Sequence, residues 1–97
     1  MRINHLVWDD WNVEHIAAHN VEPEEVESVF HSGQHYARRA GVTRYGISRY
    51  RVYGQSENGR CLFIVLDQET ENSFYVVTAR DMDGSEKSAF KKMRGKR

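Results

Sequence analysis

Two apolar runs in the C-terminal half of the chain show the clearest hydrophobic pattern. Residues 60–66 read Arg-Cys-Leu-Phe-Ile-Val-Leu and residues 73–79 read Ser-Phe-Tyr-Val-Val-Thr-Ala, with a polar turn between them. β-Branched and aromatic residues favour strands, so the runs are predicted to pair as antiparallel strands. Neither run alternates polar with apolar residues, which predicts that both faces are covered and that Val65 and Val76 lie in the core.

The first third of the chain predicts a short strand and two helices. Ile3–Trp8 can form the strand, and Asp9 or Asp10 can cap a helix over Trp11–His19 that Asn20 ends in the left-handed conformation. Pro23 suits the first turn of the second helix, because its missing N–H would have no partner there. Trp11, His15 and Ala18 share one face of the first helix, while Val26, Val29 and Phe30 line the buried face of the second, which Gly33 ends.

The rest of the chain predicts more strands and a closing helix. An edge strand is expected at His35–Ala40 and a long strand at Arg44–Gln55, which Asn58-Gly59 joins by a hairpin to the run at 60–66. The last helix is expected at Asp83–Lys92, with Ala89, Phe90 and Met93 as its apolar stripe. The order (β)ααββββα indicates one two-layer α+β domain over residues 1–93 with an antiparallel meander sheet, followed by a flexible basic tail at 94–97.

Composition narrows the class of protein. Of 97 residues 39% are hydrophobic and 29% charged, a globular mixture, and no apolar stretch approaches the roughly 20 residues of a membrane helix. The single cysteine, Cys61, excludes an internal disulfide and is expected as a small core residue, so a cytoplasmic location is predicted.

Charge is balanced in total but divided along the chain. Fourteen basic and fourteen acidic residues give a net charge of zero. Residues 1–30 hold one base against seven acids, and residues 31–97 hold thirteen bases against seven acids. A basic sheet region suits a polyanion, and the guanidinium fork of arginine suits phosphate in particular. The arginines expected on such a sheet face are Arg38, Arg39, Arg49, Arg51 and Arg80; the alternative is a solvated strand face with acidic partners.

Several short segments together resemble the BrnT family of toxins, small proteins of the RelE-like ribonuclease fold. They are Trp8-Asp9, His19-Asn-Val21 with Glu24-Glu25, Arg49 five residues before Gly54, Gly59-Arg60, Val77-Thr-Ala-Arg80, Glu86 and Phe90. The resemblance covers nearly the whole chain. The first helix departs from it, because Trp11-Asn-Val-Glu-His15 is acidic where the family commonly has a lysine.

The resemblance implies a toxin of a type II toxin–antitoxin pair that cleaves RNA without a metal or cofactor, through attack of the 2′-hydroxyl on the adjacent phosphate. Its expected partners are RNA and a cognate antitoxin protein. Arg80 would stabilise the phosphate, His19 would carry a proton and Glu86 would orient Arg80, or form only a structural ion pair with it. The residues expected to bind RNA are Arg38, Arg39, Arg49, Arg51 and Lys87.

Two alternatives stay open. His15 and His19 stand four residues apart, a spacing that can chelate a metal, but no third ligand is evident, so no metal site is expected. The second alternative is a noncatalytic protein-interaction module that keeps the toxin fold. The acidic first helix and the zero net charge favour that module.

Overall fold

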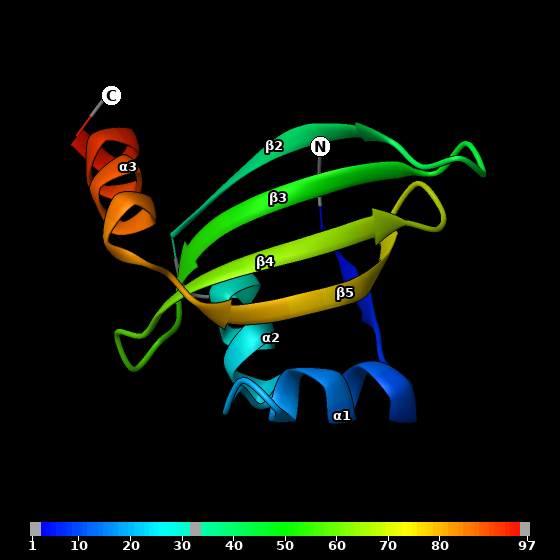
Figure 1. The fold of residues 1–97 in the computed structure, drawn as a ribbon, viewed down its shortest axis with the longest axis horizontal. Helices are drawn as coiled ribbons and strands as arrows, with labels where there is room; N and C mark the ends of the chain where they lie inside the picture. The colour runs from blue at the N-terminus through cyan, green and yellow to red at the C-terminus, as the bar shows by residue number, and fades with distance from the viewer. Residues whose placement is uncertain (1–2, 32–33, 96–97) are drawn as a thin grey trace.

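A five-stranded mixed sheet with three helices forms the part of the chain that the computed structural model describes, residues 3–31 and 34–95 (Figure 1). The strands lie in the order β1-β5-β4-β3-β2. The elements along the chain are β1 His5–Val7, α1 Asp10–Ala17, α2 Pro23–His31, β2 His35–Val42, β3 Ser48–Gln55, β4 Cys61–Gln68, β5 Ser73–Asp81 and α3 Gly84–Gly95. The predicted α+β class and element order are confirmed.

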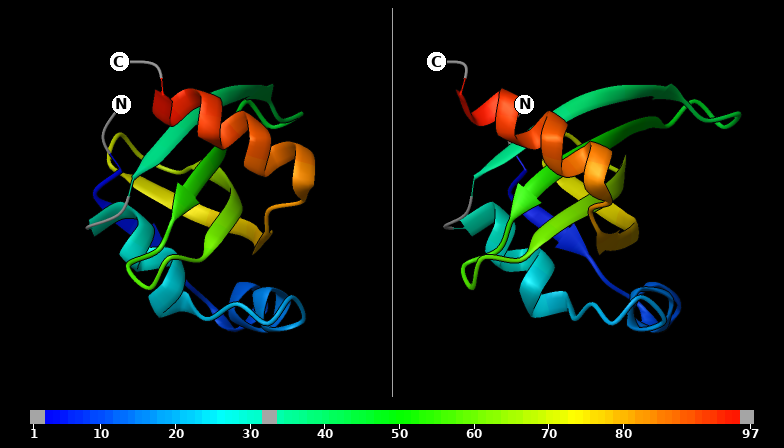
Figure 2. Two further views of the ribbon diagram at one scale, coloured as in Figure 1. Left: turned by 90° about the vertical axis from the view of Figure 1, so that its left-hand side faces the viewer. Right: turned by 60° about the vertical axis from the view of Figure 1, so that its left-hand side comes forward.

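Strands β2 to β5 form the predicted antiparallel meander, and β1 adds a parallel strand beside β5. Two helices separate β1 from the meander, and a connection of that length lets β1 lie parallel to its neighbour. Figure 2 shows α1 and α2 on one side of the sheet, while α3 lies near the opposite end of the molecule.

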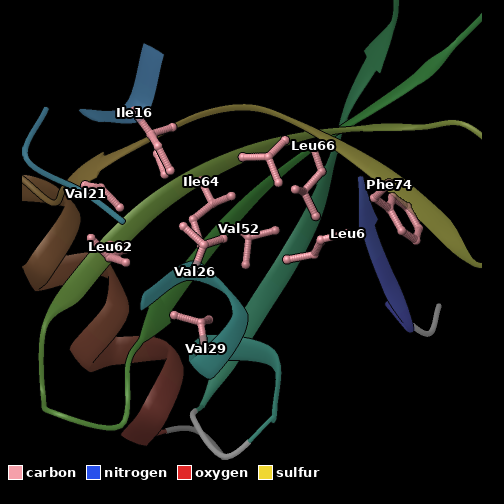
Figure 3. Packing of buried hydrophobic residues seen from close by; sticks show 12 residues of the cluster. Leu6, Ile16, Val21, Val26, Val29, Val52, Leu62, Ile64, Leu66 and Phe74 are labelled. Atoms are coloured by element: carbon pink, nitrogen blue, oxygen red, sulfur yellow. The ribbon is translucent and has the colours of Figure 1, made fainter. Parts of the chain in front are cut away.

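The core lies between the sheet and the helices α1 and α2 (Figure 3). Strand β4 contributes Leu62, Ile64 and Leu66, all fully buried, while the residues between them are only half-buried. The prediction that both faces are covered is therefore wrong. An all-apolar run cannot reveal its exposed face, because no polar residue marks it.

The opposite face is covered at one end only, where Phe90 of α3 packs edge-on against Tyr36 of β2 with ring centroids 5.9 Å apart. Val76 lies in the core as predicted, but Val65 and Cys61 are half-buried on the other side and are not core residues. These corrections follow from the strand alternation, which places every second residue of β4 away from α2.

Both ends of helix α1 have the terminating features that the sequence predicts. Asp9 caps it through a reciprocal capping box with Asn12, and Asn20 follows the helix with a φ of 60°, as predicted. Its buried residues are Asn12 and Ile16, whereas Trp11 is 61% exposed. The Asn12 amide donates to the carbonyls of Val7 and Val76. It thereby satisfies backbone acceptors of β1 and β5 at the point where β1 ends.

Several element boundaries differ from the sequence prediction by a few residues, most of all the start of β3 and the end of α3. β3 begins at Ser48 rather than Arg44, because the Thr43 hydroxyl accepts from the backbone N–H groups of Tyr45 and Ile47 and holds a turn there. Helix α3 continues to Gly95, past the predicted start of the tail, and the Arg94 guanidinium lies over the Phe90 ring. Gly33 and residues 96–97 of the predicted tail lie outside the described residues.

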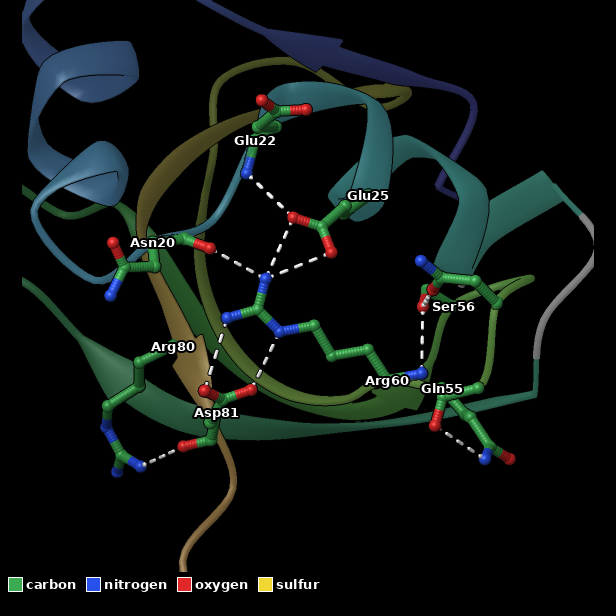
Figure 4. A network of polar contacts seen from close by, with 10 residues as sticks. Asn20, Glu22, Glu25, Gln55, Ser56, Arg60, Arg80 and Asp81 are labelled. Atoms are coloured by element: carbon green, nitrogen blue, oxygen red, sulfur yellow. Dashed lines mark hydrogen bonds and ion pairs between the residues drawn. The ribbon is translucent and has the colours of Figure 1, made fainter.

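Arg60 ties four segments together on the helix side of the sheet (Figure 4). It directly precedes β4, and its guanidinium donates to the Glu25 carboxylate of α2, to the Asn20 carbonyl after α1 and to the Asp81 carboxylate ending β5. These bonds raise the pKa of Arg60 and lower that of Asp81. The end of β5 is thereby fixed, which positions the neighbouring Arg80.

Candidate functional site

A one-residue bulge in β5 decides which face of the sheet Arg80 occupies. Val77 is the extra residue between the β4–β5 pairs on either side of it. Side chains alternate along a regular strand, so without the bulge Arg80 would share the buried face of Val76. With the bulge, Arg80 lies opposite Phe63 on the open face, and its guanidinium carbon lies 4.5 Å from the centre of the Phe63 ring.

The open side of the sheet collects most of the arginines predicted to bind RNA. Pairing places Arg38 opposite Arg51, and Tyr53 between Tyr36 and Phe63. A shallow hollow lies here, lined in part by Arg49, Arg51, Tyr53, Phe63 and Glu86. We call the surface formed by Arg38, Arg49, Arg51, Tyr53, Phe63 and Arg80 the arginine face.

Arg80 and Glu86 form a two-pronged ion pair at the edge of the arginine face. The two terminal nitrogens of Arg80 donate to the two carboxylate oxygens of Glu86 at 2.8 and 2.9 Å. The first nitrogen also donates to the Asp81 carbonyl at 3.0 Å. The pair lowers the pKa of Glu86 and raises that of Arg80, chiefly through these hydrogen bonds.

Glu86 is placed by the start of α3 as well as by Arg80. Its carboxylate accepts from the Asp83 N–H at 2.9 Å, while the Asp83 carboxylate accepts from the Glu86 N–H at 2.8 Å. This capping box fixes the carboxylate in front of the helix. Glu86 therefore holds the Arg80 guanidinium in place, an arrangement common to the catalytic and the structural interpretation of the pair.

Arg38 and Arg51 form a like-charge pair across β2 and β3. They lie directly opposite each other, and such residues have Cβ atoms about 5 Å apart. Both side chains are exposed, and neither has an acidic partner among residues 3–31 and 34–95. Opposed like charges destabilise a strand pair, so this arrangement favours an anion between them.

Arg49 differs from these two arginines, because it is already paired. Its Nε and Nη2 donate to the two carboxylate oxygens of Asp67 at 2.7 and 2.9 Å. The pair raises the pKa of Arg49. Arg49 thus offers an anion only the donors that Asp67 leaves unused.

The other predicted RNA-binding residues lie off this surface or at its rim. Arg39 points to the opposite side of the sheet, where it donates to the Ser48 hydroxyl at 3.3 Å. Lys87 is exposed on the first turns of α3, and its charge helps to lower the pKa of Asp81. Alternation along β2 separates Arg39 from Arg38, which sequence analysis had grouped together.

His19 is not brought to the Arg80–Glu86 pair. It follows α1 on the helix side of the sheet and packs edge-on against the His15 ring, with centroids 5.6 Å apart. His15 stacks on Trp11 at 5.0 Å and lies 3.2 Å from the Thr78 hydroxyl. Within the described ranges, no three His, Cys, Asp or Glu side chains gather closely enough to hold a metal ion.

Two residues that shape the site, Phe63 and Arg60, were not predicted from the sequence to do so. Phe63 supports the Arg80 guanidinium but belongs to an apolar run that gives no sign of its open side. Arg60 holds the end of β5, and its role depends on partners 35 and 21 residues away in the chain. Only the register of the sheet could have revealed either role.

Neither the family models nor the curated proteins give a match to this chain. Within the described residues, no helix is both long and apolar enough to cross a membrane. The chemistry of the site must therefore be inferred from its own groups. One open surface carries two guanidinium groups without an acidic partner among the described residues, two aromatic rings and a fixed Arg–Glu pair. Together these groups can bind a phosphate chain and contact its bases.

Proposed function

We propose that the chain binds RNA on the arginine face and cleaves it as a RelE-like endoribonuclease toxin, held inactive by a cognate antitoxin in the cytoplasm. The observation that carries the proposal is the opposition of Arg38 and Arg51, two exposed cations with no acidic partner among the described residues. A phosphate between them would replace their repulsion by two charge-assisted interactions. Tyr53 and Phe63, both half-buried beside them, suit contact with the bases of an unpaired strand.

The proposed reaction needs no metal or cofactor. The 2′-hydroxyl of one nucleotide gives its proton to water and attacks the neighbouring phosphorus, forming a 2′,3′-cyclic phosphate. The bond from phosphorus to the 5′-oxygen of the next nucleotide breaks, and that oxygen takes up a proton from water. Arg80 supports the negative charge that develops on the phosphate oxygens, and Glu86 together with Phe63 holds the guanidinium in place. The contribution of Arg38 and Arg51 is to align the chain for this attack.

A second candidate function is a noncatalytic binding module on the same surface. It is favoured by the two-pronged Arg80–Glu86 pair, which already occupies both terminal nitrogens of the arginine, and by the position of His19 on the helix side. Such a module would bind RNA without cleaving it. Both candidate functions use the arginine face, and they differ only in whether the bound RNA is cleaved.

The binding test compares neighbouring arginines on opposite faces. Arg38→Gln and Arg51→Gln should each weaken RNA binding and each lower the salt dependence of the affinity by about one phosphate contact. Arg39→Gln, on the same strand but the other face, is the matched control and should bind as the wild type does. Equal loss in all three variants, or no binding by the wild type, would rule the arginine face out as the RNA site.

A cleavage assay on the same samples separates the two candidates. Purified protein with EDTA present is incubated with free RNA and with translating ribosomes, and the products are mapped. Products that end in a 2′,3′-cyclic phosphate support the endoribonuclease. Intact RNA in both reactions, with binding retained, supports the module.

A further inference from the structure

The hairpin of β2 and β3 projects from the rest of the molecule at its turn (Figure 2, right). Three exposed apolar side chains belong to this turn and to the end of β2 that leads into it. Tyr45 is 79% exposed, Val42 54% and Ile47 36%, and they are the only large apolar side chains besides Trp11 that stand so exposed in the described residues. Burying apolar surface is a main driving force of association, so a cluster of this kind on a tip indicates a contact with another molecule.

This turn is held in one conformation by its own hydrogen bonds. The Thr43 N–H donates to the Ile47 carbonyl at 2.8 Å, and the Gly46 N–H donates to the Thr43 carbonyl at 3.0 Å. Gly46 has a φ of 79°, which a residue with a side chain rarely adopts. The backbone that carries Tyr45 is therefore preorganised, so ligand binding does not have to include the entropic cost of ordering this turn.

The composition of the hairpin indicates what that ligand is. Residues 35–55 contain five arginines and four tyrosines and no aspartate or glutamate. Arg44 lies over the Tyr45 ring, with its guanidinium carbon 5.6 Å from the centroid. A cation beside an exposed aromatic ring, on a hairpin without acids, matches a ligand that alternates negative charges with flat aromatic surfaces.

We infer that the turn at 43–47 binds an unpaired nucleotide of the RNA, with Tyr45 stacked on its base and Arg44 on its phosphate. The inference rests on the proposed function, because the same two strands carry Arg38 and Arg51 of the arginine face. It adds a substrate class: RNA with a single-stranded segment reaching from that face to the tip. Bases in a duplex are stacked on one another and offer Tyr45 no open surface.

Two RNA probes of one sequence test this, a short single strand and its blunt duplex. Tyr45→Ala should weaken binding of the single strand about tenfold to a hundredfold, the loss of one base–aromatic stack, and leave binding of the duplex unchanged. Tyr45→Phe keeps the ring and should bind both probes as the wild type does. Melting temperatures should be equal, because Tyr45 is 79% exposed and is not one of the core residues in the described part of the chain.

The outcomes separate this inference from the proposed function. A wild type that binds neither probe overturns both. Wild-type affinity of Tyr45→Ala for the single strand, or equal losses in Tyr45→Ala and Tyr45→Phe, overturns the stacked base alone. The wild type is also tested for binding to vesicles of anionic phospholipid. If Tyr45→Ala and Val42→Ala both abolish vesicle binding while both variants still bind RNA, the tip is a membrane contact and the inference of a stacked base is overturned as well.

Discussion

At the scale of single residues, the site depends on what each arginine already touches. Arg49 and Arg80 carry carboxylate partners and are fixed, whereas Arg38 and Arg51 carry none among the described residues. A fixed guanidinium suits a transition state, because its donors need no reorganisation when charge develops. An unpaired guanidinium suits binding, because its donors are still available. On the arginine face, the arginines with a carboxylate partner therefore suit catalysis, and those without one suit binding.

Arg80→Ala should slow cleavage strongly and keep the fold. Loss of one preorganised donor typically slows such a reaction ~10²–10³-fold, and Arg80→Lys should recover only part of that, because an ammonium keeps the charge but not the fork. Arg80 is 37% exposed in its side chain, so the ion pair itself should contribute less than about 1 kcal/mol. RNA cleavage rates and melting temperatures of the variants check this.

A purely structural pair would behave differently. Arg80→Ala and Glu86→Ala would then both lower the melting temperature, and cleavage, corrected for the folded fraction, would stay at the wild-type rate. That result would exclude a catalytic role for Arg80.

At the scale of elements, burial alternates along β4 and β5, and this gives a matched pair of substitutions. Val76→Ala should destabilise the domain by about 2 kcal/mol, because Val76 is fully buried and truncation leaves a cavity. Val65→Ala removes the same atoms from a half-buried position on the arginine face and should cost less than half as much. Chemical denaturation of both variants measures the difference, and equal costs would contradict the one-sided core.

Most of this fold could be predicted from local signals. Asp9 and Asn20 mark the ends of α1, Pro23 opens α2, and Asn58-Gly59 marks the β3–β4 connection, each through the conformation that its own side chain favours. Such signals act within a few residues, so a single sequence displays them.

The candidate site could be predicted only in part, because it depends on register. The alternation of Arg49, Arg51 and Tyr53 gave their common face correctly. The face of Arg80 could not be read in the same way, since the bulge at Val77 changes the alternation and its cause lies in the pairing with β4. A prediction of the site needs contacts between strands, which no local pattern contains.

At the scale of the whole molecule, His35 couples stability to pH. Its ring packs edge-on against Phe30 of α2 at 4.9 Å although the residue as a whole is exposed, and burial of the ring lowers its pKa, partly offset by a hydrogen bond to the Val29 carbonyl. A lowered pKa means that the unfolded chain binds the proton first. The contribution to stability is therefore full above about pH 6.5 and is lost as the pH falls from there.

Urea denaturation between neutral pH and the onset of carboxylate titration checks this coupling. The free energy of unfolding should fall on acidification in the wild type, and His35→Gln should flatten that fall. The carboxylates with lowered pKa, Asp81, Asp83 and Glu86, lose their contribution only near and below their ordinary values of about 4, so the two windows are distinct. An identical slope in the variant would place the pH dependence elsewhere.

The two sides of the sheet carry opposite signs, and this affects how the molecule meets a charged chain in solution. Helices α1 and α2 lie in the acidic first thirty residues, on the side away from the arginine face. Such a molecule has no net charge, but its acidic and basic residues are distributed unevenly over its two sides. An approaching polyanion exerts a torque on it before contact, turning the arginines forward and the helices back. The protein and the polyanion therefore meet in a preferred orientation, although a protein without net charge does not attract the polyanion over long distances.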